Sequence, residues 1–85
     1  MAFKCAFTLG ILGICTFVAG YGTGGIKRRI GTTTTADRCA RLVRIKDPSA
    51  NGASWANKNC FAEFGATGND GNSAYRTCQF NGEYL

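Results

Sequence analysis

The chain contains no histidine, and that absence excludes several kinds of chemistry at once. Serine and cysteine nucleophiles are most often activated by a neighbouring imidazole. Zinc sites of the Cys/His type need the same ring, and the later cysteines are too widely spaced for the close pairs of a structural zinc site. The five acidic residues are scattered along 85 positions, with no spacing typical of an acid/base pair. We therefore predict a protein that is not an enzyme, with no catalytic residue, no metal and no cofactor.

Long apolar runs are also absent, with one exception at the N-terminus. Residues 5–19 are almost wholly apolar and follow a short basic start. This layout is typical of a secretory signal peptide, and the small residues Val18 and Gly20 suit cleavage before Tyr21. A membrane anchor and a buried core helix are the alternatives, but a spanning helix needs roughly twenty apolar residues. We expect a signal peptide over residues 1–20 and a secreted, extracellular protein.

Cysteine pairing depends on that cleavage. It would remove Cys5 and Cys15 and leave an odd set, Cys39, Cys60 and Cys78. In an oxidising compartment these three are disulfide candidates. Every pairing leaves one thiol over, which is either free or joins a second chain, so a disulfide-linked dimer is a candidate assembly. We favour the Cys60–Cys78 bond, because both cysteines lie in segments with a strand-like pattern.

Residues 21–35 are rich in glycine and threonine and show no apolar periodicity, which predicts a flexible lead. Lys27, Arg28 and Arg29 form a candidate site for a processing protease, and a cut after Arg29 would release residues 30–85. The net charge of the whole chain is only +5. Its basic residues therefore indicate a solvated face or an anionic partner such as a sulfated glycan or a bacterial surface, and we expect no nucleic acid.

A single small domain is expected over residues 36–85, mostly β, with α+β as the alternative. Residues 37–46 fit either a helix capped by Thr35 or a strand over residues 41–46, and the β-branched residues favour the strand slightly. A proline and an Asn-Gly pair then predict a turn. Alternating polarity predicts two further strands, over residues 60–64 and 74–80.

Aromatic residues are numerous for so short a domain. Glu63, which lies between two of them, is expected to face solvent from a strand. Trp55 or Tyr75, close to Arg76, is a candidate for a ligand-facing platform that binds a sugar or a partner loop. The core is expected to consist of Trp55, Phe61, Phe64 and Phe80.

A series of short motifs runs through the second half of the chain: Cys39-x-x-Leu42-Val43, Pro48, Asn51-Gly52, Trp55, Cys60-Phe61-Ala62-Glu63-Phe64 and Tyr75-x-x-Cys78. This series resembles half of the small cysteine-rich extracellular modules of the PAN/apple type. The resemblance implies binding of an extracellular protein or a carbohydrate.

These observations together favour a secreted, non-enzymatic binding protein. The alternative is a basic secreted effector, a host-defence or toxin-like peptide released by processing after Arg29. Membrane contact is expected only for such an effector. A second alternative is a matrix component crosslinked through the odd cysteine.

Overall fold

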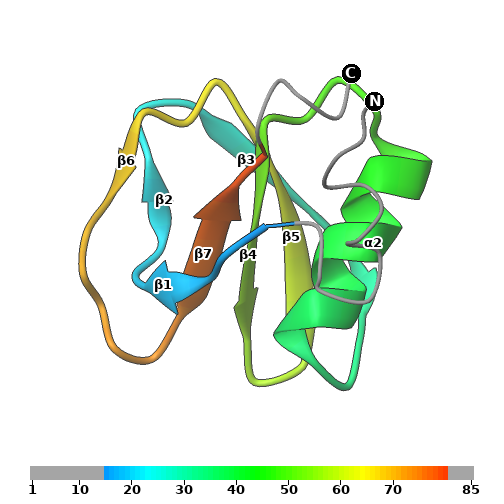
Figure 1. Ribbon diagram of the computed structural model, residues 1–85, viewed down its shortest axis with the longest axis horizontal. Helices are drawn as coiled ribbons and strands as arrows, with labels where there is room; N and C mark the ends of the chain where they lie inside the picture. Colours follow the sequence, from blue (N-terminus) through cyan, green and yellow to red (C-terminus); the bar gives the residue numbers. More distant parts are fainter. Residues whose placement is uncertain (1–14, 81–85) are drawn as a thin grey trace.

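The computed structural model describes residues 15–80, which form a small α+β domain of mostly antiparallel strands with one helix (Figure 1). The expected small, mostly β, disulfide-bonded domain is thereby confirmed, in its α+β form. The elements are, in chain order, β1 (Val18–Ala19), β2 (Gly22–Thr23), β3 (Ile26–Thr32), α2 (Ala36–Lys46), β4 (Gly52–Ala56), β5 (Asn59–Phe64), β6 (Gly68–Asn69) and β7 (Arg76–Gln79).

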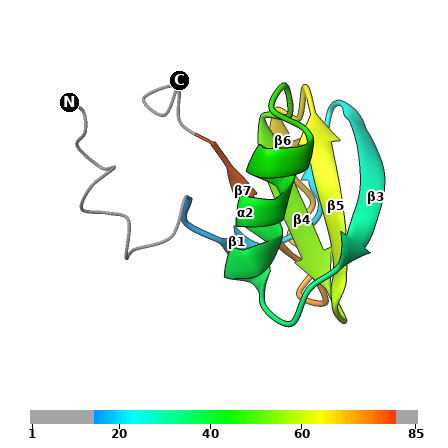
Figure 2. The same ribbon diagram turned by 90° about the vertical axis from the view of Figure 1, so that its right-hand side faces the viewer.

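Five of the strands form one antiparallel sheet in the order β1-β7-β4-β5-β3. Strand β3 is therefore an edge strand, as the turned view shows (Figure 2). Strands β2 and β6 pair separately and lie on the far side of β4 and β7 from α2 (Figure 1). The sheet thus has one face under α2 and a second face under the β2–β6 pair.

Helix α2 supplies three of the eight buried residues of the core cluster. Its fully buried residues Cys39, Ala40 and Val43 recur at helical spacing and pack against small residues of the sheet such as Ala53 and Ala62. The hydroxyl of Thr35 accepts a hydrogen bond from the Arg38 amide at 3.1 Å, as an N-cap does. The slight preference for a strand over residues 41–46 is wrong, because this cap and the buried stripe outweigh local β propensity.

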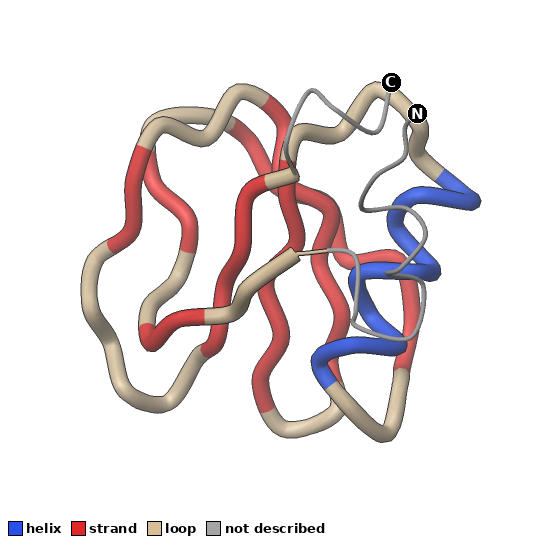
Figure 3. The backbone as a smooth tube through the Cα atoms, viewed as in Figure 1, coloured by secondary structure: helices blue, strands red, loops and turns tan. Residues whose placement is uncertain are grey.

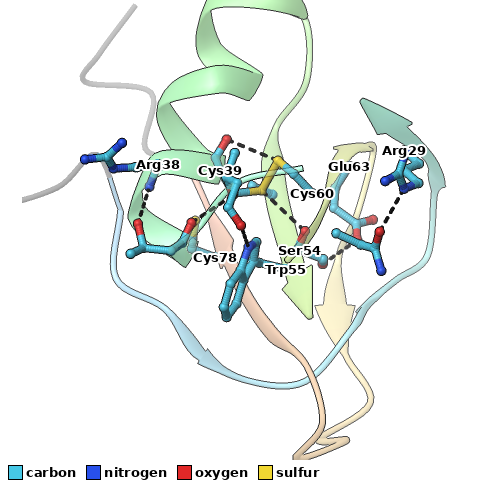
Figure 4. Close-up of a disulfide and its surroundings, with 12 residues drawn as sticks. Arg29, Arg38, Cys39, Ser54, Trp55, Cys60, Glu63 and Cys78 are labelled. Carbon is cyan, nitrogen blue, oxygen red and sulfur yellow. Dashed lines mark hydrogen bonds between the residues drawn. A yellow bond between two sulfur atoms is a disulfide. The ribbon is translucent and has the colours of Figure 1, made fainter. Parts of the chain in front are cut away.

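Two disulfides join the elements, Cys39–Cys60 and Cys15–Cys78, with Cα–Cα distances of 5.4 and 5.8 Å. The first links α2 to β5 (Figure 4). The favoured Cys60–Cys78 bond is wrong, because Cys60 lies on β5 and Cys78 on β7, with β4 between them. Two strand spacings amount to roughly 9.5 Å, which is beyond the reach of a disulfide.

The expected flexible lead contains a regular element. Residues 26–32 form β3, which pairs with β5 from Ile26 opposite Phe64 to Thr32 opposite Asn59, with a bulge near Gly31. Glycine content indicated flexibility, but a glycine is also needed where two backbones approach closely. At Gly25 an added Cβ would collide with the backbone of residues 64 and 65.

The predicted signal peptide, residues 1–20, lies mostly outside the described residues, and so does Cys5. Residues 15–20 are described: β1 pairs with β7, and Cys15 is bonded to Cys78. In the chain that keeps Cys15, this residue belongs to the cysteine framework, because the pairing of β1 brings it to Cys78. Cleavage before Tyr21 would remove Cys15 and leave Cys78 without this bond. Cleavage before Tyr21 stays a prediction. Within residues 15–80 the cysteines are all paired, and the expected odd thiol is not found there.

Candidate binding surface

The face of the sheet turned away from α2 carries polar and aromatic side chains. Side chains alternate between the two faces along a strand, and Cys60 and Cys78 lie on the helix side. Their neighbours therefore point the other way. On β4, β5 and β7 these are Ser54, Phe61, Glu63 and Thr77.

Three of these residues form a buried hydrogen-bonded network. Ser54 is 0% exposed and Glu63 is 1% exposed, and the Ser54 hydroxyl donates to Glu63 Oε2 at 2.5 Å (Figure 4). The Thr77 hydroxyl lies 2.9 Å from that of Ser54 and 3.1 Å from the carbonyl of Ala53. Glu63 Oε1 accepts no hydrogen bond from any described residue. The expectation that Glu63 faces solvent is wrong.

Strand β2 covers this network. The amide of Gly22 donates to the Ser54 hydroxyl at 3.3 Å. A Cβ added at Gly22 would lie 2.5 Å from the carboxyl carbon of Glu63, so a larger residue fits only if β2 or the Glu63 side chain shifts. Because β2 comes from a segment more than thirty residues earlier, the alternation within β5 could not reveal that its polar side would be covered.

An aromatic cluster adjoins the buried network. The Tyr21 ring contacts the Phe61 ring edge-on, with 5.6 Å between centroids and an interplanar angle of 78°. It also contacts the Tyr75 ring, with centroids 4.3 Å apart, and Lys27 Nζ lies 4.6 Å from the Tyr21 centroid. All three rings are partly exposed. We call Tyr21, Lys27, Phe61 and Tyr75 the tyrosine cluster.

The surroundings of the Tyr21 phenol shift its pKa. Burial raises its pKa above the ordinary value of 10.0, and the negative charge of Glu63 raises it further. Both effects disfavour the phenolate. Tyr21 therefore presents a neutral hydroxyl at physiological pH.

A loop holds the backbone of Tyr21 in place. The Tyr21 amide donates to Asp70 Oδ1 at 2.9 Å, and the Asp70 amide donates back to the Tyr21 carbonyl at 3.1 Å. The Asn72 amide also donates to Asp70 Oδ1, at 2.9 Å. Hydrogen bonds from the Asn72 and Tyr21 amides lower the pKa of the Asp70 carboxyl, so Asp70 keeps its charge and these contacts at neutral pH.

The residues expected to face a ligand do not form one surface. Trp55 lies opposite Arg76 on the helix side of the sheet, and its indole N–H donates to the Thr33 carbonyl at 3.2 Å. Tyr75 belongs to the tyrosine cluster instead. Of the expected core, Phe61 also belongs to this cluster. The other three, Trp55, Phe64 and Phe80, are partly buried and pack against the core from its margin.

The expected processing site lies within β3. Arg28 donates a hydrogen bond at 2.6 Å to Asp47, the residue that follows α2. Arg29 donates through Nε to Asn59 at 2.9 Å (Figure 4). Lys27 contacts Tyr21, so these neighbouring cations have separate partners in the fold. Tyr21 and Lys27 were missed as candidate binding residues, because a sequence without apolar periodicity gave no sign that this segment joins the sheet.

Within residues 15–80, no helix has the length and apolar character needed to cross a membrane. In the same range, no group of three or more acidic or cysteine side chains is placed to hold a metal ion. Comparisons with protein-family models, with curated proteins and with solved structures found no match.

Proposed function

We propose that the protein is a secreted, non-enzymatic binding module that contacts an extracellular protein through the tyrosine cluster. The observation that carries this proposal is the contact of the Tyr21 ring with two other partly exposed rings, Phe61 and Tyr75, on one face of the sheet. Tyrosine and phenylalanine are enriched in protein interfaces, and tyrosine is common among the residues that contribute most binding energy.

The cluster is already ordered before any partner binds. Tyr21 is fixed by the Asp70 loop, and Tyr75 is stacked against it. Tyrosine has few rotatable bonds, so little conformational entropy is lost when an ordered ring is covered. Lys27 adds a positive charge beside the rings, which favours a partner with acidic groups.

Burial of the Ser54–Glu63 pair supports a role other than catalysis. A hydroxyl next to a carboxylate is the kind of pair from which a nucleophile is built. Here both groups lie beneath Gly22, at 0% and 1% exposure, where no substrate reaches them. The pair is better explained as a structural contact that holds β2, and with it Tyr21, against the sheet.

The secreted location is part of the proposal. Disulfides persist mainly in oxidising compartments, and the Cys39–Cys60 bond, which lies wholly after residue 20, fits such a setting. In a chain that retains Cys15, the matrix alternative gains no support from residues 15–80, because the cysteines there are paired with one another.

The proposal is tested by screening the purified protein against displayed extracellular proteins and a glycan array. Tyr75→Ala is expected to weaken binding of a genuine partner by about thirtyfold, which corresponds to the loss of about 2 kcal/mol typical of an interface hot spot. Tyr75→Phe keeps the ring, and Arg76→Ala removes an exposed side chain on the other face. Both controls should bind within about threefold of the wild type.

A partner that binds Tyr75→Ala as tightly as the wild type would contradict the assignment of this surface. A glycan whose binding is lost in Tyr75→Ala would keep the surface and change the class of partner to carbohydrate.

A further inference from the structure

Helix α2 packs over β4 and β5, and edge strand β3 leads into it through a short loop, so that the two elements run in opposite directions. The loop after Thr32 leads directly into the start of α2 (Figure 3). Arg28, farther back on β3, donates to Asp47 just beyond the end of α2. A Cβ added at Gly31 would lie 3.7 Å from Leu42. Two surface hollows lie along α2 and β3. One has a volume of about 670 Å³ and includes Arg38, Arg41, Leu42 and Ile45 in its lining.

The second hollow, of about 320 Å³, lies between residues 28–30 and Lys46. The first hollow is lined by the outer side of α2 and the second by Lys46 and residues of β3, and we consider them together as one surface. We call it the α2–β3 face and define it by Arg28, Arg38, Arg41, Leu42, Ile45 and Lys46.

Two of the most exposed aliphatic side chains lie on or beside this face. Ile45 is 76% exposed near the end of α2, and Ile26 is 72% exposed at the start of β3. Ile26 and Arg28 are two positions apart on a strand, so they point to the same side of the sheet. A single exposed isoleucine is ordinary, but two of them among cations on one surface form a mixed patch.

The charge of the face is positive overall, because four cations against two carboxylates leave a net charge of +2. Its cations are Arg28, Arg38, Arg41 and Lys46, and the two carboxylates beside it are already in ion pairs: Asp47 with Arg28 and Asp37 with Arg41. Arg38 and Lys46 form no ion pair with any described residue. The face therefore carries uncompensated positive charge next to exposed aliphatic groups.

We propose that the α2–β3 face docks onto an anionic lipid surface. Lipid phosphates attract basic side chains, while the boundary between headgroups and acyl chains accepts short aliphatic groups. A sulfated glycan would satisfy the cations but offers nothing apolar to Ile45 and Ile26. An anionic lipid surface can contact both the basic side chains and the exposed isoleucines.

This inference goes beyond the proposed function and does not depend on it. The tyrosine cluster lies on the other face of the sheet, so each surface is tested by substitutions that leave the other intact. Loss of binding in Tyr75→Ala reports on the first surface and loss in Arg38→Gln on the second.

The test is sedimentation of the purified full chain with vesicles of phosphatidylcholine, with and without phosphatidylglycerol. We expect binding only to the anionic vesicles, with an affinity that falls as salt rises. Arg38→Gln should weaken it about fivefold, the contribution of one basic residue near a charged membrane. Arg76→Gln removes the same charge from β7, three strands away from β3, and should leave it unchanged. Circular dichroism confirms that each variant is folded.

Ile45→Ser tests the aliphatic half of the patch. It keeps every charge and should weaken binding to anionic vesicles severalfold, because a side chain that enters the interface is lost. Failure of the wild-type protein to bind anionic vesicles at low salt would overturn the proposal. So would equal losses in Arg38→Gln and Arg76→Gln, which would indicate net charge alone. Binding of heparin that Arg38→Gln weakens, without vesicle binding, would assign the face to a sulfated glycan.

Discussion

At the scale of single residues, Gly22 and Glu63 show how one contact organises a whole face. Glu63 is a buried carboxylate with one oxygen bonded to Ser54 and the other without a partner among the described residues. Burying a carboxyl group with one oxygen unpaired costs free energy that the rest of the fold must offset. Gly22 lies directly over the carboxylate, and its amide contacts Ser54. The close approach of β2 therefore depends on the missing side chain at position 22.

Gly22→Ala is expected to destabilise the domain by about 1–3 kcal/mol, the usual effect of overpacking. The added methyl group would lie 2.5 Å from the Glu63 carboxyl carbon, and either β2 or Glu63 has to move. Urea denaturation measures the change. The matched control is Gly68→Ala on the paired strand β6, where the nearest atom, Thr23 Oγ1, is at an ordinary 3.6 Å.

Gly68→Ala should unfold within about 0.5 kcal/mol of the wild type, as surface substitutions usually do. Equal stability of Gly22→Ala and Gly68→Ala would contradict the tight contact between β2 and Glu63.

At the scale of elements, the start of α2 is decided within a run of four threonines, residues 32–35. Thr35 is the N-cap, and Thr33 donates its hydroxyl to the Thr35 carbonyl at 2.9 Å. The threonines of this run therefore make different hydrogen bonds, although the residues are identical. A helix capped by Thr35 was one of two alternatives for this part of the sequence, and the hydrogen bond from the Arg38 amide to the Thr35 hydroxyl now supports it.

Thr35→Ala is expected to lower the free energy of unfolding by about 1 kcal/mol, because the Arg38 amide loses its acceptor. Thr34→Ala is the matched control, since Thr34 is exposed and makes no hydrogen bond to a described residue. Thermal unfolding followed by circular dichroism compares the two. A larger loss in Thr34→Ala than in Thr35→Ala would rule out this cap.

The sequence predicted elements better where the signal was local. Strands near residues 60–64 and 74–80 and the turn before Gly52 were predicted and are close to β5, β7 and the loop before β4. The helix remained an open alternative, because Leu42 and Val43 suit a strand as well as a helix. Strand β3 was missed entirely, since its basic residues are stabilised by pairing with β5, about thirty residues away.

The binding surface was predictable only in part, for the same reason. Tyr75 was a candidate and belongs to the tyrosine cluster, but its neighbour Tyr21 comes from the expected lead. Contacts between distant segments decide which residues share a surface, and a single sequence carries no direct signal for them.

At the scale of the whole molecule, the two disulfides attach the outer layers to the central strands. Cys39–Cys60 holds α2 against β5 across a sequence separation of 21 residues, and Cys15–Cys78 holds the N-terminal segment to β7 across 63. A domain of this size buries a small core, and its buried residues are mostly alanine and cysteine. Crosslinks therefore contribute an unusually large share of its stability.

Replacing Cys39 and Cys60 together with alanine is expected to destabilise the domain by about 3 kcal/mol, from the loop closed by the bond. Alanine is preferred to serine because both sites are 0% exposed, and a buried hydroxyl would add its own desolvation cost. Urea denaturation measures the loss, and mass spectrometry of unreduced peptides reports the pairing. Recovery of a Cys60–Cys78 peptide from the wild type would contradict the fold.

The Cys15–Cys78 bond also changes what a cut in the backbone would produce. In a chain that retains Cys15, a protease acting after Arg29 would divide the described part into residues 15–29 and 30–80, with Cys15 in one piece and Cys78 in the other. Strand β1 would stay attached to β7, and the half of β3 before the cut would stay beside β5. The product would be a nicked, two-chain protein that migrates as one species until a reductant separates it, and the basic residues 27–29 would remain on the molecule.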